Sequence, residues 1–142
     1  MGGTQSEVAA LLERRIEACR DKDIDKLMST FAAEIVYFDV APPLRFVGHD
    51  AVRDNFLRWF AEYDGQIRLA TREATIAAEG DVAFAHMLHE DSGNRNRPNG
   101  RGFWLRSTSC LRRQEAGWRI VHEHISLPID FRTGEVLLDL EP

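Results

Sequence analysis

The sequence has no apolar run long enough to cross a membrane, and only two of its 142 residues are cysteines. A membrane-spanning helix needs about 20 consecutive apolar residues, and charges interrupt every candidate run. Cys19 and Cys110 lie far apart in apolar-patterned segments, so we expect small buried side chains rather than a disulfide framework. Residues 1–10 lack the basic start and apolar segment of a secretory signal. These features predict a cytoplasmic protein with no membrane partner.

The sequence also lacks the net positive charge that general nucleic-acid binding requires. The formal net charge is -5, and affinity for phosphates depends on a positive field. One local exception is a cluster of arginines in the C-terminal half: Arg95, Arg97, Arg101, Arg106, Arg112, Arg113 and Arg119. No aromatic side chains alternate with the arginines of residues 95–101, as single-strand binding would need. We therefore expect no nucleic-acid partner.

Several motifs that bind cofactors or catalyse reactions are missing. There is no glycine-rich phosphate loop, no Gly-x-Ser-x-Gly turn and no group of clustered cysteines. His86, His122, His124 and Asp39 are residue types that bind zinc or iron. However, His-x-His on a strand supplies only two ligands, so we expect no metal and no cofactor.

The N-terminal half has the periodicity of amphipathic helices. After Ser6, a candidate N-cap, apolar residues recur at helical spacing: Val8, Leu11, Leu12, Ile16 and Cys19. Arg15 falls inside this apolar stripe, either as an inward anchor or as a residue at its edge whose charge reaches solvent. Asp23 can cap a short second helix. Gly48 precedes a third helix, which has on one side Val52, Phe56, Trp59, Phe60 and Tyr63.

The rest of the chain predicts β-strands. Strands are expected at residues 35–40, 67–78, 82–91, 104–113 and 118–128. Gly80-Asp81 suits a tight hairpin, and residues 92–100 form a polar loop. Helices followed by long antiparallel strands predict an α+β domain with helices covering one face of a sheet. Residues 129–142 are either an edge strand or an arm lying on a partner.

The strand at residues 118–126 carries candidate site residues. Alternation places Trp118, Ile120, His122, His124 and Ser126 on one face, which begins apolar and ends polar. In one interpretation, His124 lines a pocket together with His122 and Ser126, as a proton carrier or hydrogen-bond partner. In the other, the histidines only satisfy buried hydrogen bonds.

Asp39 is a candidate general base at the end of the strand at residues 35–40. It shares a face with Tyr37, and its apolar neighbours would desolvate its carboxylate. The alternative is an aspartate that caps the turn at Pro42.

Another candidate group lies on the strand at residues 104–113. Trp104 would supply an apolar wall, and Arg106, beside Thr108, a positive charge for a carboxylate or enolate. Alternatively, Arg106 is solvated or ion-paired, with Asp39 or Glu123 as the candidate partner. On the strand at residues 82–91, His86 alternates with Phe84, and His89 falls on the opposite face.

The order and spacing of these segments resemble the nuclear transport factor 2-like (NTF2-like) superfamily, in particular SnoaL-like and ketosteroid-isomerase-like small proteins. The matching segments are Asp23-Ile24-Asp25, Val36-Tyr37-Phe38-Asp39, Gly48-His49-Asp50-Ala51-Val52, Gly80-Asp81-Val82-Ala83, Arg106-Ser107-Thr108 and residues 117–126. The resemblance implies one domain over residues 1–128, followed by a tail at 129–142. The implied fold is a cone-shaped (cystatin-like) roll, in which a curved antiparallel sheet packs on three N-terminal helices around a deep pocket. It also implies a homodimer formed through the outer sheet face.

The resemblance also suggests roles for individual residues. In ketosteroid isomerases a base aspartate ends the first strand, and Asp39 stands at that position. Arg15 occupies the position of the tyrosine that binds the oxyanion in those enzymes, and the second donor position falls near Thr108 or Ser109. Without both donors the usual oxyanion site is absent, but a charged Arg15 could replace the phenol.

Together these residues predict acid–base chemistry on a small apolar carbonyl compound of polyketide, steroid or terpenoid type. Asp39 would abstract a proton next to the carbonyl, and His124, or Arg15 and Arg106, would stabilise the oxyanion. The pocket walls would come from Tyr37, Phe56, Trp59, Phe84 and Trp104. The alternative is a non-catalytic binding or oligomerisation module, in which Asp39, Arg106 and His124 neutralise one another.

Overall fold

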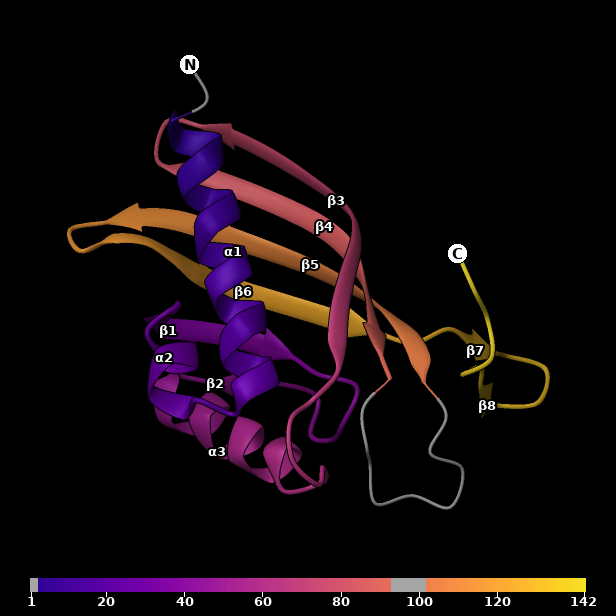
Figure 1. Cartoon of the computed structure of the whole chain (residues 1–142). Coiled ribbons are helices and arrows are strands. Elements are labelled where there is room, and N and C mark those ends of the chain that lie inside the picture. The colour runs from indigo at the N-terminus through magenta and orange to yellow at the C-terminus, as the bar shows by residue number, and fades with distance from the viewer. Residues whose placement is uncertain (1–2, 93–101) are drawn as a thin grey trace.

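A computed structural model describes residues 3–92 and 102–142 as helices packed on a curved sheet (Figure 1). The helices are α1 (Gly3–Asp21), α2 (Ile24–Met28) and α3 (His49–Phe60). The strands of the main sheet are β1 (Phe31–Phe38), β2 (Phe46–Val47), β3 (Leu69–Glu79), β4 (Val82–Asp91), β5 (Phe103–Gln114) and β6 (Gly117–Ser126). The predicted α+β fold class is confirmed.

The main sheet has the strand order β2-β1-β6-β5-β4-β3, and only the β1–β6 pair is parallel among the described strands. Helix α1 packs against β3 and β6, and α3 packs against β1 and β2. Figure 1 shows these helices on the concave side of the sheet. The sheet therefore has an inner face covered by helices and an outer face that they leave open.

Local signals in the sequence mark where two of the helices begin. The Asp23 side chain caps α2 by accepting a hydrogen bond of 3.1 Å from the backbone N–H of Lys26. Gly48 precedes α3 with a φ of 93°, a conformation that favours glycine. The predicted N-cap at Ser6 is wrong, because α1 begins at Gly3 and Ser6 lies within its first turns.

The core lies between α1, α3 and the inner sheet face. The predicted apolar stripe of α1 is buried, as are one side of α3 and the inner residues of β4. Arg15 is only 4% exposed within this stripe, so it is an inward residue and does not reach solvent. A buried arginine requires a partner on the sheet.

A β-bulge in β6 decides which of its side chains face inward. Cys110 of β5 lies opposite His122, whereas the next residue, Leu111, lies opposite Ile120. Val121 is therefore an extra residue in β6, and such an insertion interrupts the alternation of side chains.

The bulge reverses the alternation expected for residues 118–126. Trp118 and Ile120 are buried before it, but after it Glu123 is 2% exposed and His124 is exposed. The prediction that His122 and His124 share the inner face with Trp118 is therefore wrong.

The C-terminal residues form a small hairpin apart from the main sheet. Its strands, β7 (Ile129–Asp130) and β8 (Glu135–Val136), pair with each other in a separate two-stranded sheet. This segment therefore does not add an edge strand to the main sheet. We refer to residues 129–142 as the arm; Figure 1 shows it beyond the end of β6, away from the helices.

The polar loop predicted at residues 92–100 falls, except for Ser92, outside the described residues, as do Arg95, Arg97 and Arg101. In the two described ranges, no helix combines the length and apolar character needed to span a membrane.

Candidate functional site

A cavity of about 250 Å³ lies between the helices and the inner sheet face. Its lining comes from α1, α3, the end of β1 and the inner faces of β3, β4, β5 and β6. Apolar side chains make up much of the wall: Ile16, Cys19, Phe56, Trp59, Leu69, Phe103, Leu105, Ile125 and Leu127. A few polar groups project among them, which is the usual composition of a small-molecule site.

The floor of the cavity contains a buried ion pair. Arg15 Nη1 lies 2.6 Å from Glu123 Oε1, and the two side chains are 5% and 3% exposed. Ser109 accepts a hydrogen bond of 3.0 Å from Arg15 and donates one to Glu123, and Ser107 donates to the other carboxylate oxygen. Three donors thus converge on the two carboxylate oxygens of Glu123 in an apolar surrounding.

Arg15 keeps donors that its partners on the floor do not use. A guanidinium has five N–H groups. Apart from the Nη1 bonds to Ser109 and Glu123, its described contact is Nη2 to Met87 Sδ at 3.5 Å. Arg15 also lines the cavity, so it can present a fixed positive charge to a bound molecule.

A second polar group lies where β1 ends. Asp39 accepts hydrogen bonds of 2.7 Å from the Val40 N–H and 2.6 Å from Asn55 Nδ2. Arg58 donates to Asn55 Oδ1 from Nε at 3.1 Å and from Nη2 at 2.9 Å. Because arginine only donates and a carboxylate only accepts, these contacts fix the orientation of the Asn55 amide. These contacts orient the Asp39 carboxylate, whose side chain is 11% exposed.

Tyr37 stands between the two polar groups. Burial, followed by the negative charges of Glu123 and Asp39, raises the pKa of the Tyr37 phenol well above its usual value. Its ring packs edge-on against Phe31 and Phe56. Tyr37 lines the cavity, and its phenol is protonated near pH 7. It is therefore available as a neutral donor.

His89 contributes an imidazole from β4. Burial, and to a lesser degree the charge of Arg15, lowers its pKa to about 3, so the ring is neutral near pH 7. Nδ1 lies 3.0 Å from Thr71 Oγ1. His89 lines the cavity, and Nε2 makes no hydrogen bond with the described residues, which leaves it available to a ligand.

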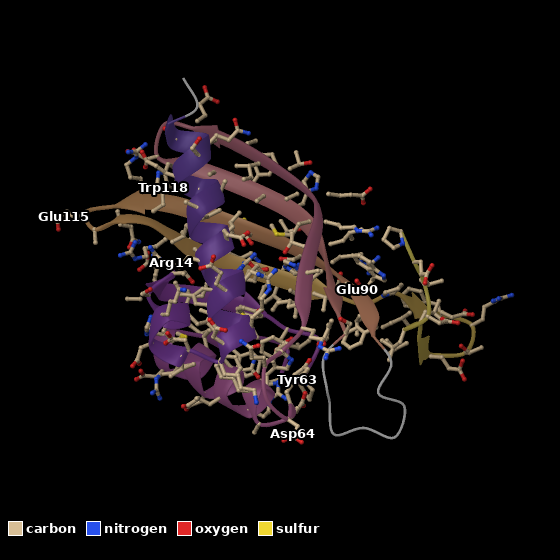
Figure 2. All side chains as sticks on the ribbon, viewed as in Figure 1. Arg14, Tyr63, Asp64, Glu90, Glu115 and Trp118 are labelled. Atoms are coloured by element: carbon tan, nitrogen blue, oxygen red, sulfur yellow. The ribbon has the colours of Figure 1, made fainter. Side chains whose placement is uncertain are left out.

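The wall near the end of α3 carries a chain of hydrogen bonds. Trp59 Nε1 donates to the Tyr63 hydroxyl at 3.1 Å, and Tyr63 donates to Asp91. Figure 2 labels Tyr63 and the following residue, Asp64, at this end of the fold. The chain fixes the position of the Trp59 ring, which faces the cavity.

Five of the predicted site residues meet in this cavity: Arg15, Tyr37, Asp39, Phe56 and Trp59. They come from the stripe of α1, the end of β1 and the inner side of α3. The structure thus brings them together, while their chemical roles stay predictions.

The other predicted site residues lie on the outer sheet face, away from the cavity: Phe84, His86, Trp104, Arg106, Thr108, His122, His124 and Ser126. Cross-strand pairing puts them in shared rows, for example Leu88–Arg106–Ser126 and His86–Thr108–His124. Placing them in the pocket is therefore wrong. Two physical causes account for the error: the β6 bulge, and an outer face that carries large apolar residues such as Phe84.

Outer-face partners replace the contacts expected for these residues. Arg106 Nε donates to Ser126 Oγ at 3.0 Å and does not pair with Asp39 or Glu123. His122 Nδ1 lies 2.7 Å from the carbonyl oxygen of Val36. The network of Asp39, Arg106 and His124 does not form, since Asp39 lies on the opposite side of the sheet.

Sequence reasoning missed Glu123, His89, Asn55 and Arg58. The buried Arg15 was the available signal for Glu123, because a charge in an apolar stripe needs an opposite charge. The alternation of side chains along β4 also placed His89 and His86 on opposite faces. The sequence did not show which of these faces is the inner one. Nothing in the sequence signals the pairing of Asn55 with Asp39.

The described ranges, 3–92 and 102–142, contain no group of three or more His, Cys, Asp or Glu residues arranged to hold a metal ion. The histidines and Asp39 weighed as ligands are separated by the sheet.

Fold and site define an α+β cone whose concave side encloses a partly polar cavity. A family model described as "SnoaL-like domain" matches residues 8–130. The chain belongs to this SnoaL-like family, within the NTF2-like superfamily.

Solved structures give the same fold. An NTF2-like protein of unknown function from Pseudomonas putida KT2440 is 32% identical, with a TM-score of 0.91 over 100% of this chain and 99% of that one. A proposed dehydratase from Streptomyces avermitilis is 17% identical, with a TM-score of 0.77 over 87% and 95%. A ketosteroid isomerase-like protein from Erwinia carotovora atroseptica SCRI1043 is 18% identical, with a TM-score of 0.71 over 85% and 93%. Comparison with curated proteins finds no significant match.

Proposed function

We propose that the protein binds a compact, mostly apolar carbonyl compound in the cavity and catalyses proton transfer at the carbon next to the carbonyl. The observation that carries the proposal is an oriented carboxylate, Asp39, facing the same apolar cavity as three hydrogen-bond donors or acceptors: Arg15, Tyr37 and His89.

Asp39 is the base in this proposal. Its two oxygens each accept one hydrogen bond, from Val40 and Asn55, so each keeps a lone pair that can face a substrate. The C–H bond breaks as the proton moves to Asp39, and the electron pair moves onto the carbonyl oxygen as an enolate.

The enolate oxygen needs a donor on the opposite side of the substrate. Tyr37 is suited to this because its phenol stays protonated. The unused N–H groups of Arg15 supply a positive charge that the floor holds in place. Neutral His89 can donate through Nε2 in one of its tautomers. In a substrate with a C=C bond next to the deprotonated carbon, the enolate is a dienolate. Return of the proton from Asp39 to its far carbon then shifts the double bond into conjugation with the carbonyl and completes an isomerisation.

The size of the cavity favours a compact substrate. Its volume, about 250 Å³, lies just below the range of about 300–1,000 Å³ typical of ligand pockets. Similarity to proteins described as dehydratase and ketosteroid isomerase-like supports carbonyl chemistry only through the shared fold.

The experiment measures exchange of protons next to the carbonyl for deuterium. Cyclic ketones are first screened by thermal shift, and the binders are incubated with the protein in D₂O and followed by NMR. Asp39→Asn removes the base but keeps the shape, so exchange should fall about 10²–10⁴-fold while the thermal shift with ligand persists.

Matched variants separate a role in the cavity from general damage. Asp81→Asn makes the same chemical change at an aspartate whose side chain is 77% exposed, and exchange should be unchanged. His124→Gln tests the outer face and should also leave exchange unchanged. Equal loss of exchange and ligand binding in Asp39→Asn would identify Asp39 as structural and refute the proposal.

The second candidate is a non-catalytic binding module. It is favoured by the internal pairing of both polar groups, Arg15 with Glu123 and Asp39 with Asn55. Ketone binding without any exchange above the buffer rate, in a protein that has kept its fold, would support this alternative.

A further inference from the structure

Asn55 is a buried polar residue in the middle of α3. It is 6% exposed and lies beside the buried Val52 and Phe56, on a helix that packs against β1 (Figure 1). Asparagine is a weak helix former because its side chain competes for backbone hydrogen bonds. A buried amide also needs hydrogen-bond partners. Helix formation and core packing therefore both disfavour asparagine at this position, and its partners must account for it.

The partners of Asn55 give its amide one favoured orientation. Arg58 donates to Oδ1 from Nε at 3.1 Å and from Nη2 at 2.9 Å. On the other side, Nδ2 donates to Asp39 Oδ2 at 2.6 Å. A flipped amide would set its oxygen against the carboxylate and its NH₂ group against the guanidinium, so acceptor would face acceptor and donor would face donor. Asn55 is thus held as a donor to Asp39.

Arg58 is in turn held by the next turn of α3 and the residues after it. Its Nη1 lies 3.0 Å from Glu62 Oε1, and the two side chains are 46% and 41% exposed. An exposed ion pair of this kind contributes little to stability. We therefore expect the pair to matter for the geometry of Asn55 more than for the stability of the fold.

The result of this chain of contacts is a fixed carboxylate plane at Asp39. The terminal torsion of an aspartate side chain is broad when nothing restrains it. Here Oδ1 accepts from the Val40 N–H at 2.7 Å and Oδ2 accepts from Asn55, so rotation about the Cβ–Cγ bond breaks at least one hydrogen bond. Proton abstraction needs reacting atoms about 3–3.5 Å apart and aligned, and a misplacement of about 1 Å can cost about 100-fold in rate.

We propose that Asn55 and Arg58 are positioning residues, which hold the Asp39 carboxylate in the orientation needed for proton abstraction. This inference rests on the proposed function, in which Asp39 is the base. Asn55 acts through Asp39, and Arg58 acts through Asn55. Both should therefore affect the rate of deuterium exchange at saturating ketone and leave the affinity for the ketone nearly unchanged.

Asn55→Leu tests the inference with a side chain of similar shape that makes no hydrogen bond. Leucine favours the helix and suits a buried position, so the fold should be kept, as circular dichroism can check. The rate of exchange at saturating ketone should fall about 10–100-fold. The dissociation constant of the ketone, measured by calorimetric titration, should change by less than about threefold.

Gln66→Leu is the matched control. Gln66 Nε2 also donates to an aspartate, Asp21 Oδ1, at 2.8 Å, but this pair is exposed and does not line the cavity. Exchange should therefore be unchanged in this variant.

Arg58→Ala decides the question if Asn55→Leu does not fold, because the Arg58 side chain is 46% exposed. It should lower the exchange rate about tenfold. Arg113→Ala removes an arginine of similar exposure, 40%, that does not line the cavity, and it should leave exchange unchanged.

An exchange of the two side chains separates positioning from a structural role. The double variant Asp39→Asn, Asn55→Asp restores a donor and an acceptor at the same two positions, and residue 55 can still accept from Arg58. The melting temperature should therefore stay close to that of the wild type. Deuterium exchange should stay as low as in Asp39→Asn, because the carboxylate is no longer at the end of β1.

The outcomes distinguish this inference from the proposed function. Unchanged exchange in Asn55→Leu, beside an inactive Asp39→Asn, would overturn the inference and leave the proposed function standing. No exchange in the wild type, or wild-type exchange in Asp39→Asn, would overturn both. Equal loss of exchange and ketone affinity in Asn55→Leu would show that Asn55 shapes the cavity, and recovered exchange in the double variant would show that the carboxylate need not stand at position 39. Either of these last two results overturns the inference.

Discussion

Removing Glu123 should destabilise the fold, because it breaks the buried ion pair in the cavity floor. Glu123→Ala leaves the Arg15 guanidinium buried, 5% exposed, without its counter-charge. It also leaves the hydroxyls of Ser107 and Ser109 without their acceptor. Breaking a buried ion pair on one side costs about 3–5 kcal/mol.

The expected change in melting temperature follows from the length of the chain. At about 2.1 cal/mol/K per residue, the entropy of unfolding of 142 residues is about 0.3 kcal/mol/K. A loss of about 3–5 kcal/mol then lowers the melting temperature by about 10–17 °C. Urea denaturation and differential scanning calorimetry measure the two quantities independently.

Two further variants test whether the cost arises from the unpaired charge. Glu115→Ala changes an exposed glutamate at the tip of the β5–β6 hairpin, labelled in Figure 2. Glu115 does not line the cavity, and the change should shift stability by less than about 0.5 kcal/mol. The double variant Arg15→Met, Glu123→Leu removes both charges and should recover most of the loss. A loss below about 1 kcal/mol for Glu123→Ala, or a double variant that equals the sum of its singles, would refute the reasoning.

Three other predictions follow from the site. Burial lowers the folded-state pKa of His89 to about 3, so the unfolded chain binds more protons than the folded chain below about pH 6.5. Stability should therefore fall as the pH drops from about 6.5 towards 3. Urea denaturation should show a weaker pH dependence in His89→Gln, and an unchanged dependence would contradict this origin. Burial raises the pKa of Cys19 to about 12. A thiol reagent should therefore label Cys110 and leave Cys19 unmodified in the native protein. Equal labelling of the two cysteines, measured by mass spectrometry, would disprove the burial of Cys19. Arg58→Ala frees the Asn55 amide. The rate of deuterium exchange should fall about tenfold, with little change in melting temperature. An unchanged exchange rate in this variant would contradict the prediction.

The fold could be predicted from sequence because its signals are local. The stripe of α1, the Asp23 cap and the Gly80-Asp81 hairpin each depend on a few neighbouring residues. Asp39 and Tyr37 were also assigned to a common side correctly, because no bulge separates them.

The site could be predicted only in part because the sheet's inner face is decided by long-range register. Because of one extra residue, Val121, the inner face carries Glu123, and His124 lies on the outer face. On β4, large Phe84 points outward while small Ala83 and Ala85 are buried, so side-chain size alone favours the wrong face. Contacts such as Asn55 with Asp39 join separate elements and leave no pattern in either segment.

We propose carbonyl chemistry in the cavity between the helices and the inner sheet face. A crystal structure with the best-binding ketone tests it most directly. We expect the carbonyl oxygen within hydrogen-bond distance of Tyr37, Arg15 or His89, and the adjacent carbon about 3–3.5 Å from a carboxylate oxygen of Asp39. A ketone bound on the outer face, or oriented in the cavity with its carbonyl away from these donors, would contradict the account.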